Sequence, residues 1–342
     1  MSRLAQYARD WLADVIAGWN CFWFTPVDPA TLAVIRICTG AMLFYTHLVW
    51  SFDLDSFFGG NPWISEDAMR TLRPDSYVWS YFFWIHSDKL LWTMHIAALV
   101  VFALLTLGLF SRLMSVLAFI ATLSYITRVP GALFGLDQIN LMLAMYLMIG
   151  PSGAAYSLDR LIARRRTGQG LPPAGPSVAA NIAIRLVQLH MCIIYLFAGL
   201  SKLEGNSWWS GNAMWLAFGN YEYQSIDMTW MARHPLLVNL LTHLTIFWEI
   251  YYCALIWPRK LRPIMLALAV PMHLGIALCL GMMTFGLVML IGNLAFVPPR
   301  IIRALFDRDS SKGRAGEGAE SATPTASVQT GKRQPQSSRK RR

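Results

Sequence analysis

The amino-acid sequence predicts an all-α, polytopic membrane protein with about eight transmembrane helices. Of its 342 residues, 55% are hydrophobic and 14% are charged, whereas soluble domains carry about a quarter charged residues. The mean hydropathy is +0.42, and the apolar residues gather in runs close to the roughly 20 residues that a helix needs to cross a bilayer. We expect short amphipathic helices on the extracytoplasmic face, within the loops 52–89 and 202–235, which are rich in Trp and Tyr.

The first segment, residues 1–30, is predicted to be an amphipathic helix that lies on the membrane surface. Leu4 and Trp11 belong to an apolar set that recurs at helical spacing, and Arg9 and Asp14 lie between its members. These charges interrupt any continuous apolar core, so the segment does not read as a cleavable signal peptide. Apolar residues alternating with charges in this way are typical of an interfacial helix.

The transmembrane domain is expected over residues 31–300. Its eight candidate spans are 31–51, 90–110, 113–129, 133–150, 181–201, 236–257, 263–280 and 282–298. Prolines mark several of the boundaries, because proline lacks the N–H that continues a helix: Pro130 separates the third span from the fourth, and Pro258 follows the sixth. The segment 151–180, rich in Arg and Pro, is predicted to be a flexible cytoplasmic linker between two halves.

Residues 301–342 are predicted to form a disordered, basic cytoplasmic tail. The chain has a net charge of +10, and residues 312–342 alone carry eight Lys or Arg and two Glu in a stretch rich in Ser, Gly, Thr and Pro. Such a composition cannot bury a core. Because the charge is concentrated there, it argues against a nucleic-acid partner; anionic lipid head groups or solvent remain as its surroundings.

The orientation follows from the basic residues, which favour cytoplasmic segments. Starting from a cytoplasmic N-terminus, the inside segments before the tail hold eleven of them: Arg3, Arg9, Arg112, Arg160, Arg164, Arg165, Arg166, Arg185, Arg259, Lys260 and Arg262. The outside segments hold six: Arg70, Arg73, Lys89, Arg128, Lys202 and Arg233. Both termini are therefore expected in the cytoplasm, and Lys202 on the extracytoplasmic side.

Lys202 is the candidate for chemistry. It ends the apolar run of the fifth span and is followed by a turn with Gly205 and then by Trp208 and Trp209. A lysine that is desolvated beneath aromatic rings loses its proton more easily than a lysine in water, because burial disfavours the ammonium. The alternative is a lysine that merely snorkels into an interfacial belt of aromatic residues.

Other ionisable residues lie inside the predicted spans, where they are costly and therefore functional candidates. Arg36 and Arg185 are expected to snorkel, and Glu249 to pair with Arg36 or another donor. Five histidines fall in spans: His47, His95 and His243 in outer halves, His190 and His273 near the middle. We expect His190, His273 and Tyr195 to share a polar cavity with Lys202. The five cysteines are scattered singly, without the spacing of a metal site, and no metal is predicted.

The segment from Tyr195 to Met214 resembles the HTTM (horizontally transferred transmembrane) family and the membrane part of its relative, the vitamin K-dependent gamma-glutamyl carboxylase. The family pattern is Tyr-Phe-x-Ala-Gly-x-x-Lys-Leu, a short acidic turn, then Trp, Gly and Met. The matching residues are Tyr195, Ala198, Gly199, Lys202, Leu203, Trp209, Gly211 and Met214. Weaker matches are Asp28-Pro29 with Arg36, the segment 156–159, and His273 with Phe285, so that the resemblance covers residues 15–300.

The resemblance implies a function for Lys202. In the family, the corresponding lysine is the base that deprotonates vitamin K hydroquinone; oxygen then adds, the quinone becomes an epoxide, and the alkoxide formed on the way removes a γ-proton from glutamate so that CO2 can add. It thus implies a lyase- and epoxidase-like enzyme with a reduced quinone as cofactor, membrane lipids around it and an extracytoplasmic protein substrate. We assign Lys202 and His273 as catalytic, and as substrate-binding Tyr195, His190, Trp208, Trp209, Gly211 and Met214.

Two features set the chain apart from the carboxylases. They place a histidine near the start of the fourth span, where this chain has Leu136-Asp137-Gln138-Ile139-Asn140. They also carry a large luminal domain, whereas we expect only a short cytoplasmic tail after Pro299. The location that the resemblance implies is a bacterial inner membrane.

Two other functions remain compatible with the sequence. The first is a non-catalytic membrane module that binds lipid or a partner, with Lys202 as an anchor. The second is a haem or quinone electron carrier, for which His190 and His273 are the best pair of axial ligands by depth.

The basic-residue count generates a test of topology. Single cysteines placed within residues 204–230 should react with a membrane-impermeant thiol reagent added from the outer face, while cysteines within 165–175 should not. Labelling of 165–175 from outside would overturn the orientation.

Overall fold

The computed structural model describes residues 3–72, 79–167 and 174–307. The chain divides into two compact units, residues 1–299 and 300–342, and each is considered by itself. The predicted tail from residue 308 onward and the centre of the predicted linker, residues 168–173, lie outside the described residues. The described residues are helical and contain no β-strand, only an isolated bridge between Val27 and Ser177. The predicted all-α class is confirmed.

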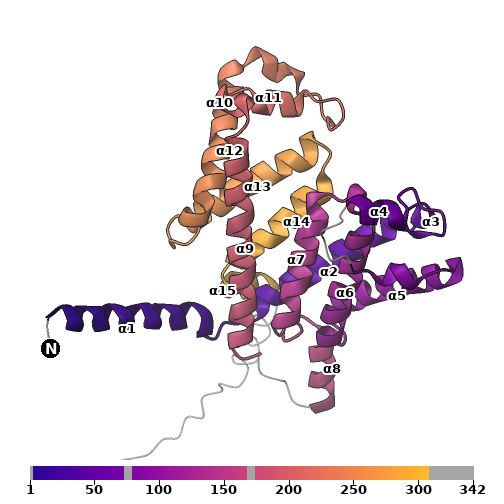
Figure 1. The fold of residues 1–342 in the computed structure, drawn as a ribbon. Helices are drawn as coiled ribbons and strands as arrows, with labels where there is room; N and C mark the ends of the chain where they lie inside the picture. The colour runs from indigo at the N-terminus through magenta and orange to yellow at the C-terminus, as the bar shows by residue number, and fades with distance from the viewer. Residues whose placement is uncertain (1–2, 73–78, 168–173, 308–342) are drawn as a thin grey trace, which may run out of the picture. The chain divides into compact units, whose positions relative to one another are not determined.

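The helices follow one another along the chain as labelled in Figure 1. The first half contains α1 (Arg3–Phe24), α2 (Ala30–Trp50), α3 (Leu54–Phe58), α4 (Glu66–Leu72), η1 (Tyr81–Trp84), α5 (Asp88–Leu107), α6 (Ser111–Arg128), η2 (Pro130–Ala132), α7 (Gly135–Ile149) and α8 (Leu158–Thr167). The second half contains α9 (Val178–Lys202), α10 (Asn206–Trp209), α11 (Ala213–Phe218), η3 (Thr229–Arg233), α12 (Pro235–Leu255), α13 (Arg262–Cys279), α14 (Met283–Asn293), η4 (Leu294–Phe296) and α15 (Pro299–Phe306).

Each of the eight predicted spans coincides with a helix, but the number of spans is not confirmed. Among the described residues, five helices are long and apolar enough to cross a membrane: α2, α5, α9, α12 and α13. A sixth span results if Met283–Phe296 and Pro299–Phe306 are counted as one. The helix α7 is apolar but only 15 residues long. The helix α6 contains several Ser and Thr residues, which lower its hydropathy and whose hydroxyls bond to carbonyls of their own helix, as at Ser115, Thr122 and Ser124.

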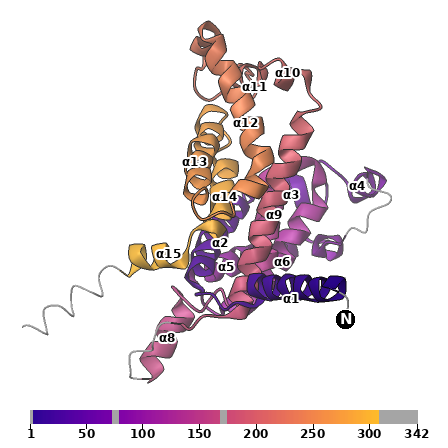
Figure 2. The ribbon, with the colours of Figure 1, turned by 90° about the vertical axis from the view of Figure 1, so that its left-hand side faces the viewer.

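Two large clusters of buried residues lie within residues 1–299, and α2 and α7 contribute to both. One cluster joins α2 and α7 to α9, α12, α13 and α14, with Tyr195 and Trp248 among its large members. The other joins α2 and α7 to α3, α5 and α6, with Phe102 and Tyr125 at its centre. In Figures 1 and 2, α9 and α12 lie side by side along much of their length.

The helix α1 has no buried residue. Its apolar side chains, among them Leu4, Trp11 and Trp19, are exposed, as suits the expected helix at the membrane surface. The end of α1 is held by α9: Asn181 Nδ2 donates to the carbonyls of Phe22 (2.8 Å) and Trp23 (3.0 Å). Arg185 lies over the Phe22 ring at 4.4 Å, so this arginine is held by protein groups rather than snorkelling to lipid head groups.

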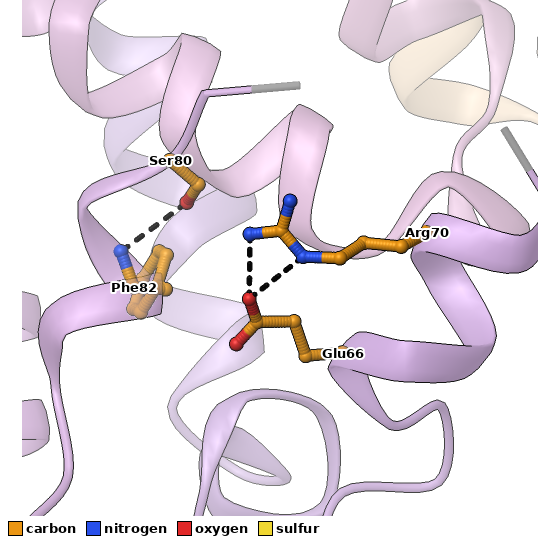
Figure 3. A network of polar contacts seen from close by, with 4 residues as sticks. All are labelled: Glu66, Arg70, Ser80 and Phe82. Carbon is orange, nitrogen blue, oxygen red and sulfur yellow. Dashed lines mark hydrogen bonds and ion pairs between the residues drawn. The ribbon is translucent and has the colours of Figure 1, made fainter. Parts of the chain in front are cut away.

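The loop 52–89 contains the expected short helices α3, α4 and η1. In α4, both Nε and Nη2 of Arg70 approach Glu66 Oε1, at 2.9 and 2.7 Å, one helical turn away (Figure 3). The 3-10 helix η1 begins at Ser80, whose hydroxyl accepts from the Phe82 N–H at 3.3 Å (Figure 3) and donates to the Ser124 carbonyl of α6 at 2.8 Å. The loop is therefore attached to α6 through Ser80.

Arg36 does not snorkel, contrary to the expectation from the sequence. Its side chain is fully buried and donates to the carbonyls of Ser152 (3.1 Å) and Tyr156 (2.6 Å). Tyr156 adopts a positive φ of 47°, a backbone conformation that is uncommon outside glycine and that sequence periodicity does not reveal. The turn before α8 thus supplies carbonyl oxygens to a buried cation.

Gly108, between α5 and α6, is required by this arrangement. Its φ is +70°, and a Cβ there would overlap the Arg36 guanidinium and the Ser157 side chain. Gly108→Ala should therefore lower the stability of the protein, by at least about 1–2 kcal/mol from the left-handed backbone alone. Thermal unfolding in detergent measures the effect. Gly18→Ala, in an open helical position, is the control, and equal unfolding temperatures for the two variants would contradict this account.

Candidate functional site

The helix α9 carries Lys202 at its last position. The helix begins at Ser177, whose hydroxyl accepts from the Ala180 N–H, and its 25 residues form one of the five candidate spans. A turn through Leu203 and Gly205 then leads into α10, with the Gly205 N–H donating to the Lys202 carbonyl at 3.1 Å. The lysine therefore lies where a long apolar helix gives way to a loop.

Gly199, one turn before Lys202, lets α9 approach α12 closely. A Cβ at this position would lie 2.7 Å from Ile250 Cγ1, 3.0 Å from the Ile250 backbone nitrogen and 3.1 Å from Glu249 Cβ. These distances are too short for any side chain larger than hydrogen. The close approach brings Glu249 of α12 to the level of Lys202.

Lys202 forms an ion pair with Glu249, with Nζ and Oε2 2.7 Å apart. The lysine side chain is 22% exposed and that of the glutamate 11%. The ammonium also reaches the Ala198 carbonyl at 3.3 Å and lies 5.4 Å from the centre of the Trp208 ring. The contacts of Lys202 thus comprise one carboxylate, one long hydrogen bond and one aromatic face.

The ion pair forms part of the wall of a cavity of about 380 Å³. The cavity lies between the end of α9, the short helices α10 and α11, and the helices α12 and α13. Apart from Lys202, Glu249 and Thr245, the residues that line it are apolar or aromatic: Trp208, Met214, Ala217, Phe218, Leu241, Leu244, Trp248, Leu268, Pro271, Met272, Gly275, Ile276 and Leu280. This is the composition of a small-molecule site, apolar with a few polar groups that fix orientation.

The segment with α10 and α11 is fixed onto α12 through Gly211. This glycine has a φ of +77°, and a Cβ there would overlap the Asn239 side chain. The Thr242 hydroxyl lies 3.0 Å from the Gly211 carbonyl and accepts from the Met214 N–H at 3.2 Å. Figures 1 and 2 show both short helices at one end of α12. Gly211 therefore shapes the turn that brings Met214 into the cavity wall, although it does not line the cavity itself.

The two tryptophans that follow Lys202 lie in different surroundings. Trp208 lines the cavity and lies over the lysine. Trp209 is two-thirds exposed, and its indole N–H donates to the Leu203 carbonyl at 2.7 Å. The predicted aromatic cover over Lys202 is thus formed by one tryptophan.

Tyr195 and His273 belong to a buried polar network next to the cavity. Tyr195 Oη lies 2.6 Å from His273 Nε2 and accepts from Asn293 Nδ2 at 2.7 Å; Tyr252 in turn donates to Asn293 Oδ1 at 2.6 Å. His273 Nδ1 has no hydrogen-bond partner among the described residues. Trp248, which lines the cavity, packs on Tyr195 with ring centres 4.8 Å apart. The network therefore lies behind the cavity wall rather than in it.

The structure does not gather the membrane histidines around Lys202. His190 lies 12 residues before Lys202, about 18 Å along the helix, and its Nδ1 is 2.9 Å from Tyr146 Oη. His47 and His95 lie in the α2–α5–α6 region: His47 Nδ1 is 2.8 Å from the Leu43 carbonyl, and His95 Nδ1 is 2.6 Å from the Tyr125 hydroxyl. His243 is exposed. Within the described parts of the chain, no group of three or more His, Cys, Asp or Glu residues is placed to hold a metal ion.

A comparison of the sequence with models of protein families gives a match whose range includes the site and the helices that form it. The model of the HTTM domain matches residues 24–300. The chain belongs to the HTTM family. The matched region contains every residue that lines the cavity, together with the Tyr195–His273 network. Comparison with curated proteins gives no match, and comparison with solved structures gives none either. The family assignment agrees with the resemblance read from the sequence, and the apolar helices with a multi-pass membrane protein.

Glu249 is the site residue whose partner the sequence left open. A carboxylate within an apolar span was a signal that it needed a cation, but the sequence alone did not distinguish Arg36 from other donors. In the HTTM domain Arg36 is bound to backbone carbonyls, and Lys202 is the cation that meets Glu249.

The ion pair should dominate the stability of this end of α9. Removing one member of a buried pair leaves a charge without compensation, which costs about 3–5 kcal/mol when burial is complete. Because Lys202 is partly exposed, we expect about 1–3 kcal/mol for Lys202→Met or Glu249→Leu alone, and a smaller loss for the double variant.

Thermal unfolding of the four proteins in a double-mutant cycle measures the coupling. A parallel cycle with Glu204→Leu, which removes an exposed carboxylate near Lys202, should give none. A Lys202–Glu249 coupling no larger than the Lys202–Glu204 coupling would mean that the pair adds nothing to stability.

Proposed function

We propose that this HTTM protein binds a lipid-soluble hydroquinone in the cavity and that Lys202 removes its hydroxyl proton. The observation that supports this most directly is the Lys202–Glu249 pair in the wall of an otherwise apolar cavity. A hydroquinone combines the two properties that such a site selects, a large apolar body and a weakly acidic hydroxyl. The reaction type is proton transfer to a positioned base.

The entry route fits a substrate that is dissolved in the bilayer. Leu244 of α12 and Leu268 of α13 line the cavity and are both exposed. Apolar exposed side chains of this kind suit contact with lipid tails. We infer that a ligand enters from the membrane past these two side chains.

The position of Lys202 in the cavity wall suits a proton-transfer role as well as anchoring. Its ammonium faces a cavity lined by Trp208, Met214 and Leu241, and it is only about one-fifth exposed. When a substrate fills the cavity and excludes water, the charged form of the lysine loses solvation. Once the ammonium has given up a proton, the neutral amine is placed to take up the proton of a bound hydroxyl.

For the steps after proton removal we propose the chemistry of the carboxylases that this sequence resembles. Removal of the hydroquinone proton is the first step of epoxidase- and carboxylase-like reactions, which would make the protein a lyase that uses a vitamin K hydroquinone-like molecule. An extracytoplasmic protein would be the second substrate. Trp208 of α10 and Met214 of α11 line the cavity, and they lie in the segment that the sequence assigns to the extracytoplasmic face.

A non-catalytic lipid-binding module is the second candidate, because the same cavity suits a lipid tail. In that case the Lys202–Glu249 pair fixes α9 to α12, and only the positive charge of Lys202 matters. The two functions differ in what an arginine at position 202 would do.

Lys202→Arg separates these two functions. Arginine keeps the charge and pairs with Glu249, but it does not give up its proton in proteins. We expect the variant to insert and fold normally and to lose at least 100-fold in the oxidation rate of a reduced naphthoquinone, as for removal of a general base. The rate is followed by the absorption change of the quinone in nanodiscs, with Lys89→Arg, at the exposed start of α5, as the control.

Addition of a small free amine should restore part of the activity of Lys202→Arg or, more readily, of Lys202→Ala, which leaves space for it. Full activity in Lys202→Arg would remove the base role and leave the lipid-binding function.

A further inference from the structure

Glu249 is an unusual carboxylate because it has so few hydrogen-bond donors. Its Oε2 atom is 2.7 Å from Lys202 Nζ and has no other partner among the described residues. Thr245 and Trp248 of α12, which also line the cavity, carry donors, but these donate to the carbonyls of Leu241 and Met265. A carboxylate with one partner in an apolar wall is costly to keep charged once that partner is lost.

Asp159, a carboxylate elsewhere in the same protein, has several hydrogen-bond donors. Its two oxygens accept from the Phe110 N–H (2.7 Å), the Ser111 N–H (2.8 Å) and the Ser111 hydroxyl (2.8 Å). Three donors satisfy the negative charge, and the carboxylate fixes the turn between α5 and α6 to the start of α8. Glu249 has no such set of donors, so its surroundings do not favour a permanent anion.

We propose, on the basis of the function proposed above, that Glu249 is the final acceptor of the substrate's proton and that Lys202 passes the proton on to it. Lys202 then remains as the counter-ion of the substrate anion. The carboxyl group of Glu249 then takes part in the reaction in addition to joining α9 and α12.

The proton movement balances within the site. An N–H bond of the Lys202 ammonium breaks and an O–H bond forms on Glu249 Oε2, which gives a neutral amine and a neutral carboxylic acid. The substrate O–H bond then breaks, its proton joins the lysine nitrogen, and the electron pair stays on the substrate oxygen. The sum is a proton transferred from the substrate to Glu249, without any oxidant or reductant.

The charge balance of the cavity favours this outcome. Before the transfer the site holds one cation and one anion, Lys202 and Glu249; afterwards it holds Lys202 and the substrate anion. If Glu249 kept its charge instead, two anions would share one lysine within an apolar enclosure, and like charges close together disfavour ionisation. The separation of 2.7 Å between Nζ and Oε2 is a hydrogen-bonding distance, but the pair does not have the angles of a hydrogen bond, so the first transfer needs a change in side-chain angle and no approach of the two helices.

A probe that has an acidic hydroxyl but is not a hydroquinone separates the transfer of the proton from the oxidation of the substrate. We choose a 4-nitrophenol with a long alkyl chain, whose anion absorbs visible light and whose neutral form does not. The full-length protein in lipid nanodiscs is titrated with this probe at a pH where the free probe is neutral. Visible absorption reports the bound anion, and infrared spectra report whether a neutral carboxylic acid accompanies it.

Glu249→Gln identifies the acid. We subtract the infrared spectrum of probe-bound Glu249→Gln from that of the probe-bound wild type. The difference should contain the carbonyl band of a neutral carboxylic acid, and this band should shift in D2O. Its intensity should correspond to about one carboxylic acid per bound probe anion. Glu204→Gln, which removes an exposed carboxylate two residues from Lys202, should leave the band unchanged. In Glu249→Asp the band should persist at an altered frequency, which keeps the test available if Glu249→Gln does not fold.

The outcomes separate the two proposals. If the probe binds as its anion and no carboxylic acid band depends on Glu249, the inference about Glu249 is overturned while proton removal in the cavity stands. If the wild type does not ionise the probe at all, the proposed function fails, and the role of Glu249 fails with it.

Discussion

The contact between α9 and α12 at Gly199 is the constraint on which the site depends. Without a side chain at this position, the backbone of α9 approaches Ile250 and Glu249 closely, and the ammonium of Lys202 reaches a carboxylate 2.7 Å away. In a membrane, helices associate through close backbone packing at small residues and through polar contacts rather than through the hydrophobic effect. Gly199 and the Lys202–Glu249 pair provide these two kinds of contact next to each other.

The remaining parts of the site serve to keep the cavity beside this pair. Thr242 of α12 holds the turn at Gly211, so that Met214 closes one side. On another side, α13 contains Pro271, which lines the cavity. Proline cannot donate a hydrogen bond within the helix and bends it.

The sequence predicted the helices of this protein better than the partners of its polar residues. Long apolar runs place α2, α5, α9, α12 and α13 because the length of a run and the thickness of a bilayer are linked. The same argument fails for α6 and α7. Burial among other helices allows α6 to carry hydroxyls bonded to its own carbonyls and allows α7 to be short.

The partners of buried charges depend on how helices are rotated against one another, and spacing along one chain does not contain that information. Lys202 and Glu249 stood out as costly residues in apolar surroundings, yet their pairing required the packing of α9 on α12. Arg36 was expected to reach lipid head groups because the turn with Tyr156 in a left-handed conformation was not foreseen. The histidines show the same limit: His190 was expected to share a cavity with Lys202, but it lies beside Tyr146 instead.

The Tyr195–His273 network explains why the polar residues next to the cavity need not take part in the reaction. It links α9, α12, α13 and α14 through Tyr195, Tyr252, His273 and Asn293, so it holds together the helices that carry Lys202, Glu249 and the opposite wall. Trp248 separates it from the cavity while packing on Tyr195. A network that is almost completely satisfied makes its surroundings rigid, and a proton transfer over 2.7 Å needs such a rigid frame. The protein therefore combines a well-bonded set of polar residues, which fixes helix positions, with the sparsely bonded Lys202–Glu249 pair, to which we assign the proposed proton transfer.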